Sequence, residues 1–211
     1  MKNLLILMAF LFLTTNINAQ VTSKNIYSSP NLKEVISTHK IIAVLPFKVS
    51  NKYKKLPKNY DEQTNKDEES ALSFNLQNNF CAVMSIKKDV YPIKVLNVEA
   101  TNSILRENNM LDKLDTFSPQ QIANILGVDG IIICEYSYTK TNSELGAMVN
   151  EYFWMSNKVA LGEFTMSIFN SKEGELIWSF NKTMKQEYGS YPNVIIERMF
   201  SKIGRNFPYQ K

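Results

Sequence analysis

The spacing of apolar residues along the chain predicts helices and strands in alternation. A continuous apolar run over residues 40–47 indicates a strand buried on both faces, because a half-exposed strand would alternate apolar and polar positions. Residues 69–84 place Leu72, Leu76 and Phe80 at helical spacing, which predicts an amphipathic helix. Residues 131–138 predict a strand that begins fully buried and then becomes alternating.

Shorter signals predict the remaining elements. Ser118, Pro119 and Gln121 supply the N-cap, the first-position proline and the third-position glutamine of a helix that we expect to end at a left-handed Gly127. The Asn and Gly content of residues 170–174 predicts a hairpin turn. We also expect strands at 91–98, 159–169 and 175–180, helices at 31–39, 99–109 and 192–207, and irregular segments at 20–30 and 49–66; in the last helix one stripe carries Ile196, Phe200, Ile203 and Phe207.

The order of these elements predicts one α/β domain. It reads β-α-β-α-α-β-β-β-α, without an internal repeat and without a linker that would divide the chain. We therefore expect a single domain over residues 40–211, preceded by a leader segment at 20–39.

The first nineteen residues are typical of a cleavable export signal. A basic start at Lys2 is followed by ten apolar residues, 4–13, and by a polar stretch that ends on the small residue Ala19. A stable membrane span needs about 20 apolar residues, so a short N-terminal anchor is the less favoured alternative. Cleavage before Gln20 would leave 192 residues in the periplasm or outside the cell. Because Gln20 is not a cysteine, we expect no lipid anchor.

Charge and composition argue against several classes of function. Removal of Lys2 with the signal lowers the net charge from +4 to +3, and this charge is spread too evenly for a nucleic-acid surface. The acidic residues between Asp61 and Glu69 lack the glycine turn and the spacing of a calcium loop, so solvated surface is the better interpretation. The single histidine, His39, has no ligand set around it and is expected to be a surface or hydrogen-bonded residue.

No familiar catalytic motif is present either. The sequence contains no G-x-S-x-G elbow, no phosphate-binding loop and no H-E-x-x-H zinc motif. We therefore expect a protein that is not an enzyme, with no catalytic residue, metal or cofactor. The rival hypothesis is an envelope hydrolase with an unrecognised site.

Four segments occur in an order that is known from bacterial envelope proteins. They are 41–47, 72–84, 125–132 and 169–178, which contain the AVLPF strand ending, an amphipathic helix, the turn Gly127-Val128-Asp129-Gly130 and the hairpin FNSKEGELIW. Together they resemble a group that includes the curli-secretion channel lipoprotein (CsgG-like), the lipoprotein activator of penicillin-binding proteins (LpoB-like) and the N-terminal domain of TolB. Asn170 replaces the usual Asp, and Val128 replaces a small residue.

The resemblance implies both a fold and a mode of action. The fold would be a three-layer α/β domain, Rossmann-like or TolB-N/CsgG-like, with a mixed, mostly antiparallel sheet flanked by helices. The function would be that of a non-catalytic accessory protein of the cell envelope, which supports secretion or peptidoglycan synthesis by binding another envelope protein. A homo-oligomeric structural component is the alternative.

The connection at residues 143–162 is the segment most suggestive of a binding surface. It is much longer than the usual hairpin turn of two to five residues and is rich in aromatic residues and methionine. Such side chains anchor protein interfaces, so we expect Tyr152, Phe153, Trp154 and Met155 to bind a partner. Alternatively, these residues extend the two strands and fold back onto the core.

The two cysteines leave two interpretations open. Cys81 falls in a predicted helix and Cys134 in a predicted buried strand, and both are apolar surroundings in which free cysteines are common. In an oxidising compartment a disulfide between them is feasible if that helix lies on that strand.

Overall fold

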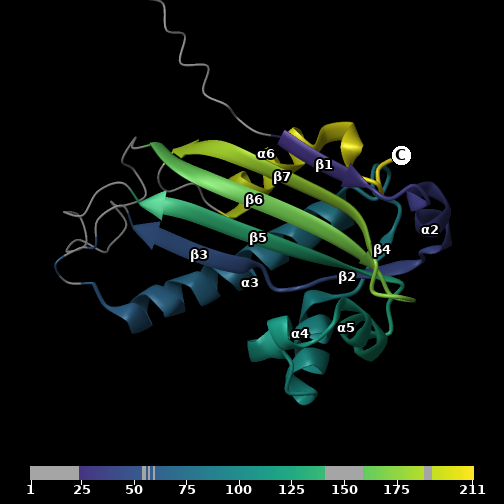
Figure 1. Ribbon diagram of the computed structural model, residues 1–211, viewed down its shortest axis with the longest axis horizontal. Coiled ribbons are helices and arrows are strands. Elements are labelled where there is room, and N and C mark those ends of the chain that lie inside the picture. Colours follow the sequence, from purple (N-terminus) through teal and green to yellow (C-terminus); the bar gives the residue numbers. More distant parts are fainter. Residues whose placement is uncertain (1–23, 54–55, 57, 59, 141–158, 188–191) are drawn as a thin grey trace, which may run out of the picture.

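The computed structural model describes residues 24–53, 56, 58, 60–140, 159–187 and 192–211. In chain order its elements are β1 (Lys24–Ser28), α2 (Leu32–Thr38), β2 (Ile41–Val44), β3 (Lys48–Tyr53), α3 (Glu62–Ile86), β4 (Lys94–Val95), α4 (Val98–Glu107), η1 (Leu111–Thr116), α5 (Pro119–Leu126), β5 (Gly130–Lys140), β6 (Val159–Asn170), β7 (Leu176–Glu187), α6 (Pro192–Ile203) and η3 (Gly204–Asn206). Figure 1 shows them as one sheet with helices on both faces.

The seven strands form an open sheet in the order β1-β7-β6-β5-β2-β4, and β3 also pairs with β5. The long strands β5, β6 and β7 and the edge strand β1 pair with one another in antiparallel fashion. β2 and β3 are parallel to β5 and lie one after the other along the same side of it. The predicted mixed, mostly antiparallel sheet flanked by helices is therefore confirmed.

Helices α3 and α6 cover one face of the sheet and enclose the larger core. Strand residues such as Ile132, Cys134 and Phe164 pack there against both helices. The predicted stripe on the last helix is confirmed for Ile196, Phe200 and Ile203, and Phe207, which follows the helix, is buried as well. The helices meet through aromatic rings, with the centroids of Phe80 on α3 and Phe200 on α6 only 4.9 Å apart. Such ring contacts add to the hydrophobic burial that holds this layer together.

Helices α4 and α5, with η1 between them, cover only part of the second face. Leu105 of α4 and Ile122 of α5 are buried against Ala43, Leu45 and Ile131, which lie on or just after β2 and at the start of β5. In Figure 1 these helices lie below one end of the sheet, and the longer parts of β5, β6 and β7 extend beyond them. The domain thus has three layers where α4 and α5 are present and a sheet face without a described helix elsewhere.

The helix boundary at α5 forms as its sequence predicts. The Ser118 side chain accepts a hydrogen bond from the Gln121 N–H, the Gln121 side chain caps Ser118 in return, and Pro119 occupies the first turn. Gly127 adopts φ +64°, the left-handed conformation that ends the helix. The hairpin turn over 170–174 is also confirmed, because β6 and β7 are antiparallel neighbours.

Asp129, directly after α5, joins three segments that are distant in the sequence. Its Oδ2 accepts hydrogen bonds from the backbone N–H groups of Lys40, at 2.7 Å, and Ile41, at 2.9 Å. Its backbone carbonyl accepts from the N–H of Ser171 in the β6–β7 hairpin, at 3.0 Å. Burial by itself raises the pKa of Asp129, but the N–H donors of Ile41 and Lys40 outweigh this effect and lower the pKa.

The prediction of a loop over 49–66 is wrong. Lys48–Tyr53 forms β3, and α3 begins at Glu62 rather than at residue 69. The sequence of β3 contains Lys and Asn and has low intrinsic strand preference, so its conformation depends on pairing with β5. The first turns of α3 are polar on all sides and lack apolar periodicity, but Asp61 caps them by accepting from the Thr64 N–H.

Three other boundaries differ from the predictions. The strand expected at 91–98 is only Lys94–Val95, and Tyr91 instead packs in the aromatic core. The last helix ends at Ile203 and continues as the short helix η3. Within the segment expected to be a polar leader, Lys24–Ser28 forms β1. All five residues of β1 are exposed, so they show no apolar alternation that could have indicated a strand.

Replacement of Asp129 by alanine should destabilise the whole domain. The N–H groups of Lys40 and Ile41 would lose their acceptor, and a part-buried unsatisfied donor costs roughly 1–3 kcal/mol. Urea unfolding should therefore show a lower midpoint. The matched control is Asp112→Ala, at an exposed carboxylate in η1, which should change the midpoint little. Equal midpoints for the two variants would contradict this role of Asp129.

Candidate functional site

The candidate site is the part of the second sheet face that α4, η1 and α5 leave uncovered, which we call the open face. Cross-strand partners project to the same side of a sheet, so the strand register defines its members. They are Lys48, Ser50 and Lys52 on β3, Glu135, Ser137 and Thr139 on β5, Glu163, Thr165 and Ser167 on β6, and Ser179, Asn181 and Thr183 on β7.

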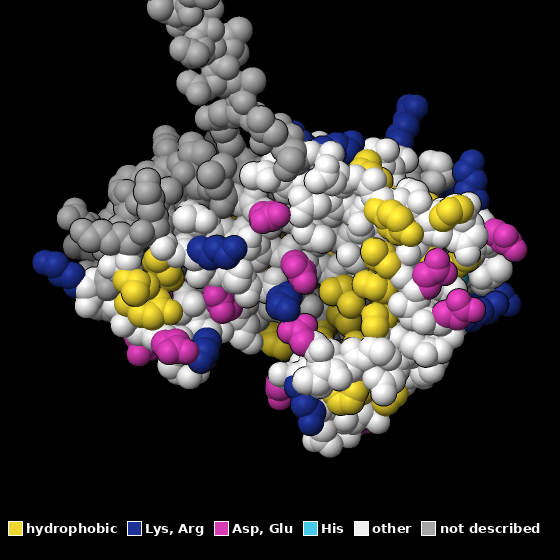
Figure 2. All heavy atoms as spheres, in the orientation of Figure 1, with side chains coloured by type: hydrophobic (Ala, Val, Ile, Leu, Met, Phe, Trp, Pro, Cys, Tyr) yellow, Lys and Arg dark blue, Asp and Glu magenta, His cyan; other side chains and the backbone are white. Residues whose placement is uncertain are grey.

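Alternation along β5 separates the open face from the core. Cys134 and Tyr136 point into the core and are 0% and 3% exposed, whereas Glu135 between them is exposed. This is the predicted change from a buried to an alternating strand, and it occurs where α4 and α5 no longer cover the sheet. Figure 2 views this side of the molecule: acidic and basic groups are scattered over a largely polar surface, and hydrophobic side chains gather towards α5.

Hydrogen bonds within the open face hold its side chains in place. The Asn181 side-chain amide donates to Thr165 Oγ1 at 2.8 Å and to Glu163 Oε1 at 3.1 Å. The ammonium group of Lys48 donates to the Asp115 carboxylate of η1 at 2.8 Å, and this hydrogen bond raises the pKa of Lys48. Acidic and basic groups are thus interspersed on a surface of short, mutually bonded polar side chains.

A shallow hollow of about 260 Å³ lies on the open face. Its lining includes Lys48 and Ser50 of β3, Glu135 and Ser137 of β5, and Thr165 of β6. These groups offer hydroxyl, carboxylate and ammonium contacts at the surface. This chemistry suits recognition of a polar protein surface, in which direct hydrogen bonds are spread over the contact area.

His39 lies at the other end of the sheet and is a buried, hydrogen-bonded residue. Its Nδ1 is 2.7 Å from the Tyr209 hydroxyl, and its Nε2 is 3.4 Å from Asn170 Oδ1. Burial lowers the pKa of His39, although Asn170 and Asp129 act in the opposite direction. Gly130 makes room for the ring, because a Cβ there would lie 2.9 Å from His39 Cε1. The expectation of a hydrogen-bonded histidine is met, and its role is to attach the C-terminal segment to the β6–β7 hairpin.

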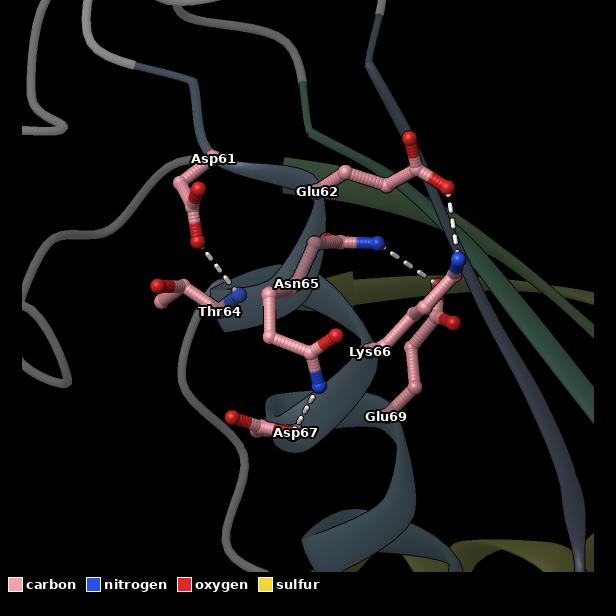
Figure 3. A network of polar contacts seen from close by, with 8 residues as sticks. Asp61, Glu62, Thr64, Asn65, Lys66, Asp67 and Glu69 are labelled. Atoms are coloured by element: carbon pink, nitrogen blue, oxygen red, sulfur yellow. Dashed lines mark hydrogen bonds and ion pairs between the residues drawn. The ribbon is translucent and has the colours of Figure 1, made fainter.

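The acidic residues after Asp61 form local contacts along α3 (Figure 3). Asp61 caps the helix, Glu62 pairs with Lys66 at 2.6 Å, and Asp67 accepts from Gln63 at 2.8 Å. Glu69 accepts from the Asn65 side chain at 3.0 Å and from the backbone N–H of Asn51 in β3 at 2.6 Å. In the described part of the chain, no three His, Cys, Asp or Glu residues are grouped so that they could hold a metal ion.

Cys81 and Cys134 lie in the same core cluster, because α3 packs on the face of β5 that carries Cys134. Both thiols are free and buried. Burial raises the pKa of Cys81 to about 12, and burial together with the neighbouring Cys81 raises the pKa of Cys134 as well. Buried thiols with raised pKa values are poor nucleophiles, so neither is a catalytic candidate here. A disulfide between them stays a prediction.

The residues expected to bind a partner, Tyr152, Phe153, Trp154 and Met155, lie outside the described residues. The positions of the flanking strands are known: β5 ends at Lys140, and β6 begins at Val159 as its antiparallel neighbour. Among the described helices, none combines the length and apolar character needed to cross a membrane.

Comparisons with known proteins give similarity at the level of the fold. No protein-family model matches the sequence, and the search of curated proteins finds no match. Among solved structures, a lipoprotein from Neisseria meningitidis shares 12% identity at a TM-score of 0.44, over 79% of this chain and 96% of that chain. A PelC dodecamer from Paraburkholderia phytofirmans shares 12% identity at a TM-score of 0.40, over 90% and 98%. The C-terminal domain of LpoB from Salmonella enterica shares 12% identity at a TM-score of 0.33, over 74% and 94%.

Replacement of Tyr209 by phenylalanine should destabilise the protein by roughly 1–3 kcal/mol, because the Nδ1 atom of buried His39 would lose its hydrogen-bond partner. Stability should also depend on pH through His39. Its folded pKa is lowered below the usual value of about 6.5, so the unfolded chain binds more protons as the pH falls below 6.5. Stability should be retained above pH 6.5 and should decrease below it.

Chemical unfolding between pH 5 and 8 measures both effects. Tyr27→Phe is the matched control, because the Tyr27 ring is 46% exposed. An equal loss of stability in the two variants would rule out a specific His39–Tyr209 contact.

Proposed function

We propose that this chain is an exported, non-catalytic accessory protein of the cell envelope that binds another protein through its open face. The observation that carries the proposal is the unequal covering of the sheet. Among the described residues, α3 and α6 pack on one face, whereas α4, η1 and α5 cover the other face only near β2 and the start of β5. Antiparallel sheets commonly keep one face in water, and the polar face left in water here is a surface that another molecule can reach.

The composition of the open face fits a partner that binds reversibly. Its hydroxyl and amide groups are stable in water, and neighbours such as Thr165, Asn181 and Glu163 already satisfy one another. An interface of this kind contains many polar contacts, in contrast to the apolar interfaces of obligate complexes. The export signal at residues 1–19 supports a location outside the cytoplasm, and the four sequence motifs support an envelope role in secretion or peptidoglycan synthesis.

We propose further that Tyr152, Phe153, Trp154 and Met155 supply the apolar anchor of the same interface. The segment that contains them is attached to the ends of β5 and β6, which are two of the strands that form the open face. A polar area next to a few aromatic anchors is a common arrangement in protein interfaces, because a small number of large side chains contribute most of the binding energy.

A photoreactive amino acid placed at Ser137 should crosslink a specific envelope protein in living cells. Ser137 lies in the middle of the open face, so a bound partner would be within reach. The matched control is Ser85, an exposed serine on α3 at the opposite side of the sheet. The crosslinked species should appear on denaturing gels from Ser137 and be absent from Ser85. The same products from both positions, or none from Ser137, would refute binding through the open face.

Replacement of Tyr152, Phe153 and Trp154 together by serine tests the apolar anchor. The melting temperature should stay nearly unchanged, and the crosslink from Ser137 should be lost, because the anchor would be removed without disturbing the core. A large decrease in melting temperature would instead assign these residues to the core and would disprove this part of the proposal.

A further inference from the structure

Strand β1 forms one edge of the sheet, and none of its side chains is fully buried. All five residues from Lys24 to Ser28 are exposed, including Ile26 at 39% and Tyr27 at 46%. Burial of an aliphatic or aromatic side chain is usually the main contribution that holds a strand in place. In β1 this contribution is small, so the strand is held mainly by its backbone pairing with β7.

The register shows how few hydrogen-bonded pairs hold β1. The N–H of Ser29 donates to the carbonyl of Ile177 at 2.9 Å, which makes these two residues a hydrogen-bonded pair. Such pairs alternate with non-hydrogen-bonded pairs along an antiparallel ladder. Within β1, only Tyr27 and Asn25 are therefore directed at β7, and the backbone groups of Lys24, Ile26 and Ser28 point outward.

The strand next to β1 is anchored in the larger core. Trp178 and Phe180 of β7 are 1% and 0% exposed and stack on each other inside the larger core. Trp178 also contacts Phe207 after α6, with ring centroids 6.0 Å apart. Strand β7 is held by β6 along its full length, so its outer edge is a preformed acceptor for an extended segment.

One side chain of β1 contacts an aromatic ring of β7. The ammonium group of Lys24 lies over the ring of Phe180, 6.0 Å from its centroid. A cation at this distance from an aromatic face is attracted by it. This contact adds to the backbone pairing of residues 24–28 with β7, which sets the register even without Lys24.

The other described sheet edges are protected in ways that β1 is not. Along β3, the Glu69 carboxylate accepts from the backbone N–H of Asn51 and so occupies a group that another strand would need. The opposite edge strand, β4, has only two residues. Short strands and edge-capping carboxylates both prevent unwanted pairing. Within the described part of the chain, the edge formed by β7 and β1 has neither protection.

We propose that β1 is exchangeable, and that the β7 edge accepts β1 from a second copy of this chain. Strand β1 of a second copy would pair with the β7 edge as the chain's own β1 does. Its residues 24–28 would reproduce the observed register and the Lys24–Phe180 contact. The hinge would be the turn at residues 29–31, between β1 and α2. Reciprocal exchange joins two copies, and sequential exchange joins a series of them. This self-assembly is separate from partner binding through the open face.

The intramolecular strand sets the concentration at which exchange occurs. A segment on a short tether has an effective concentration of about 1 mM at its own site. Exchange should therefore be slight at micromolar protein concentration and substantial near 1 mM, or wherever copies are held together locally. The amount of exchanged species should rise with protein concentration.

Two variants of the full mature chain, each with one added cysteine, test the proposal. Lys24 and Lys182 are directly paired across β1 and β7 at a non-hydrogen-bonded position, where two cysteines can form a disulfide. We would mix Lys24→Cys with Lys182→Cys at about 1 mM, near the effective concentration of the tethered strand, and oxidise the mixture. In this mixture the bond can form only between copies. The native Cys81 and Cys134 are buried and contribute little.

The control mixture contains Lys24→Cys and Lys113→Cys, because Lys113 is exposed on η1 and is not on the β7 edge. The linked peptides identify each heterodimer by mass. The 24–182 heterodimer should form at about tenfold higher yield than the 24–113 heterodimer, because strand exchange would hold residues 24 and 182 together, whereas residues 24 and 113 meet only by random collision. Its yield should decrease on dilution. Equal yields in the two mixtures, or products that link only residue 24 to residue 24, would overturn the proposal while leaving binding through the open face intact.

Discussion

The carboxylate of Asp129 is the interaction on which the rest of the architecture depends. Through two backbone N–H groups it fixes the start of β2, and through its own carbonyl it fixes the β6–β7 hairpin. Two residues before Asp129, Gly127 ends α5. Gly130, directly after Asp129, leaves room for the ring of His39, and His39 contacts Tyr209 near the C-terminus. The turn Gly127-Val128-Asp129-Gly130 therefore has a structural explanation: these residues assemble one end of the sheet.

This arrangement also explains the location of the candidate site. The constrained end of the sheet carries α5 and the polar cluster around His39, and its groups are occupied by contacts within the protein. The long strands β5, β6 and β7 extend from this end beyond α4 and α5. The strands hold the side chains of the open face in fixed positions relative to the core.

The sequence predicted those elements whose determinants are local. The capping residues Ser118 and Gln121, the C-cap Gly127 and the apolar stripe of α6 each require only a few neighbouring residues. The buried-to-alternating change in β5 was visible for the same reason, and it indicated one side of the candidate site. Strands β1 and β3 were missed, because their polar sequences become strands only through pairing with β7 and β5. Residues from four strands form the open face, and no short sequence pattern brings them together.

The long-range contacts of the N-terminal segment have a consequence for the order in which the domain is completed. Strand β1 pairs with β7, which is made much later. His39 contacts Asn170 and Tyr209, which lie 131 and 170 residues after it in the chain. A polypeptide that emerges N-terminus first must expose these early segments until its last hundred residues are present. The β5–β6–β7 meander can assemble from residues closer in sequence. Strand β1 can therefore pair only after β7 has been made, so its backbone groups stay without their β7 partners during most of synthesis.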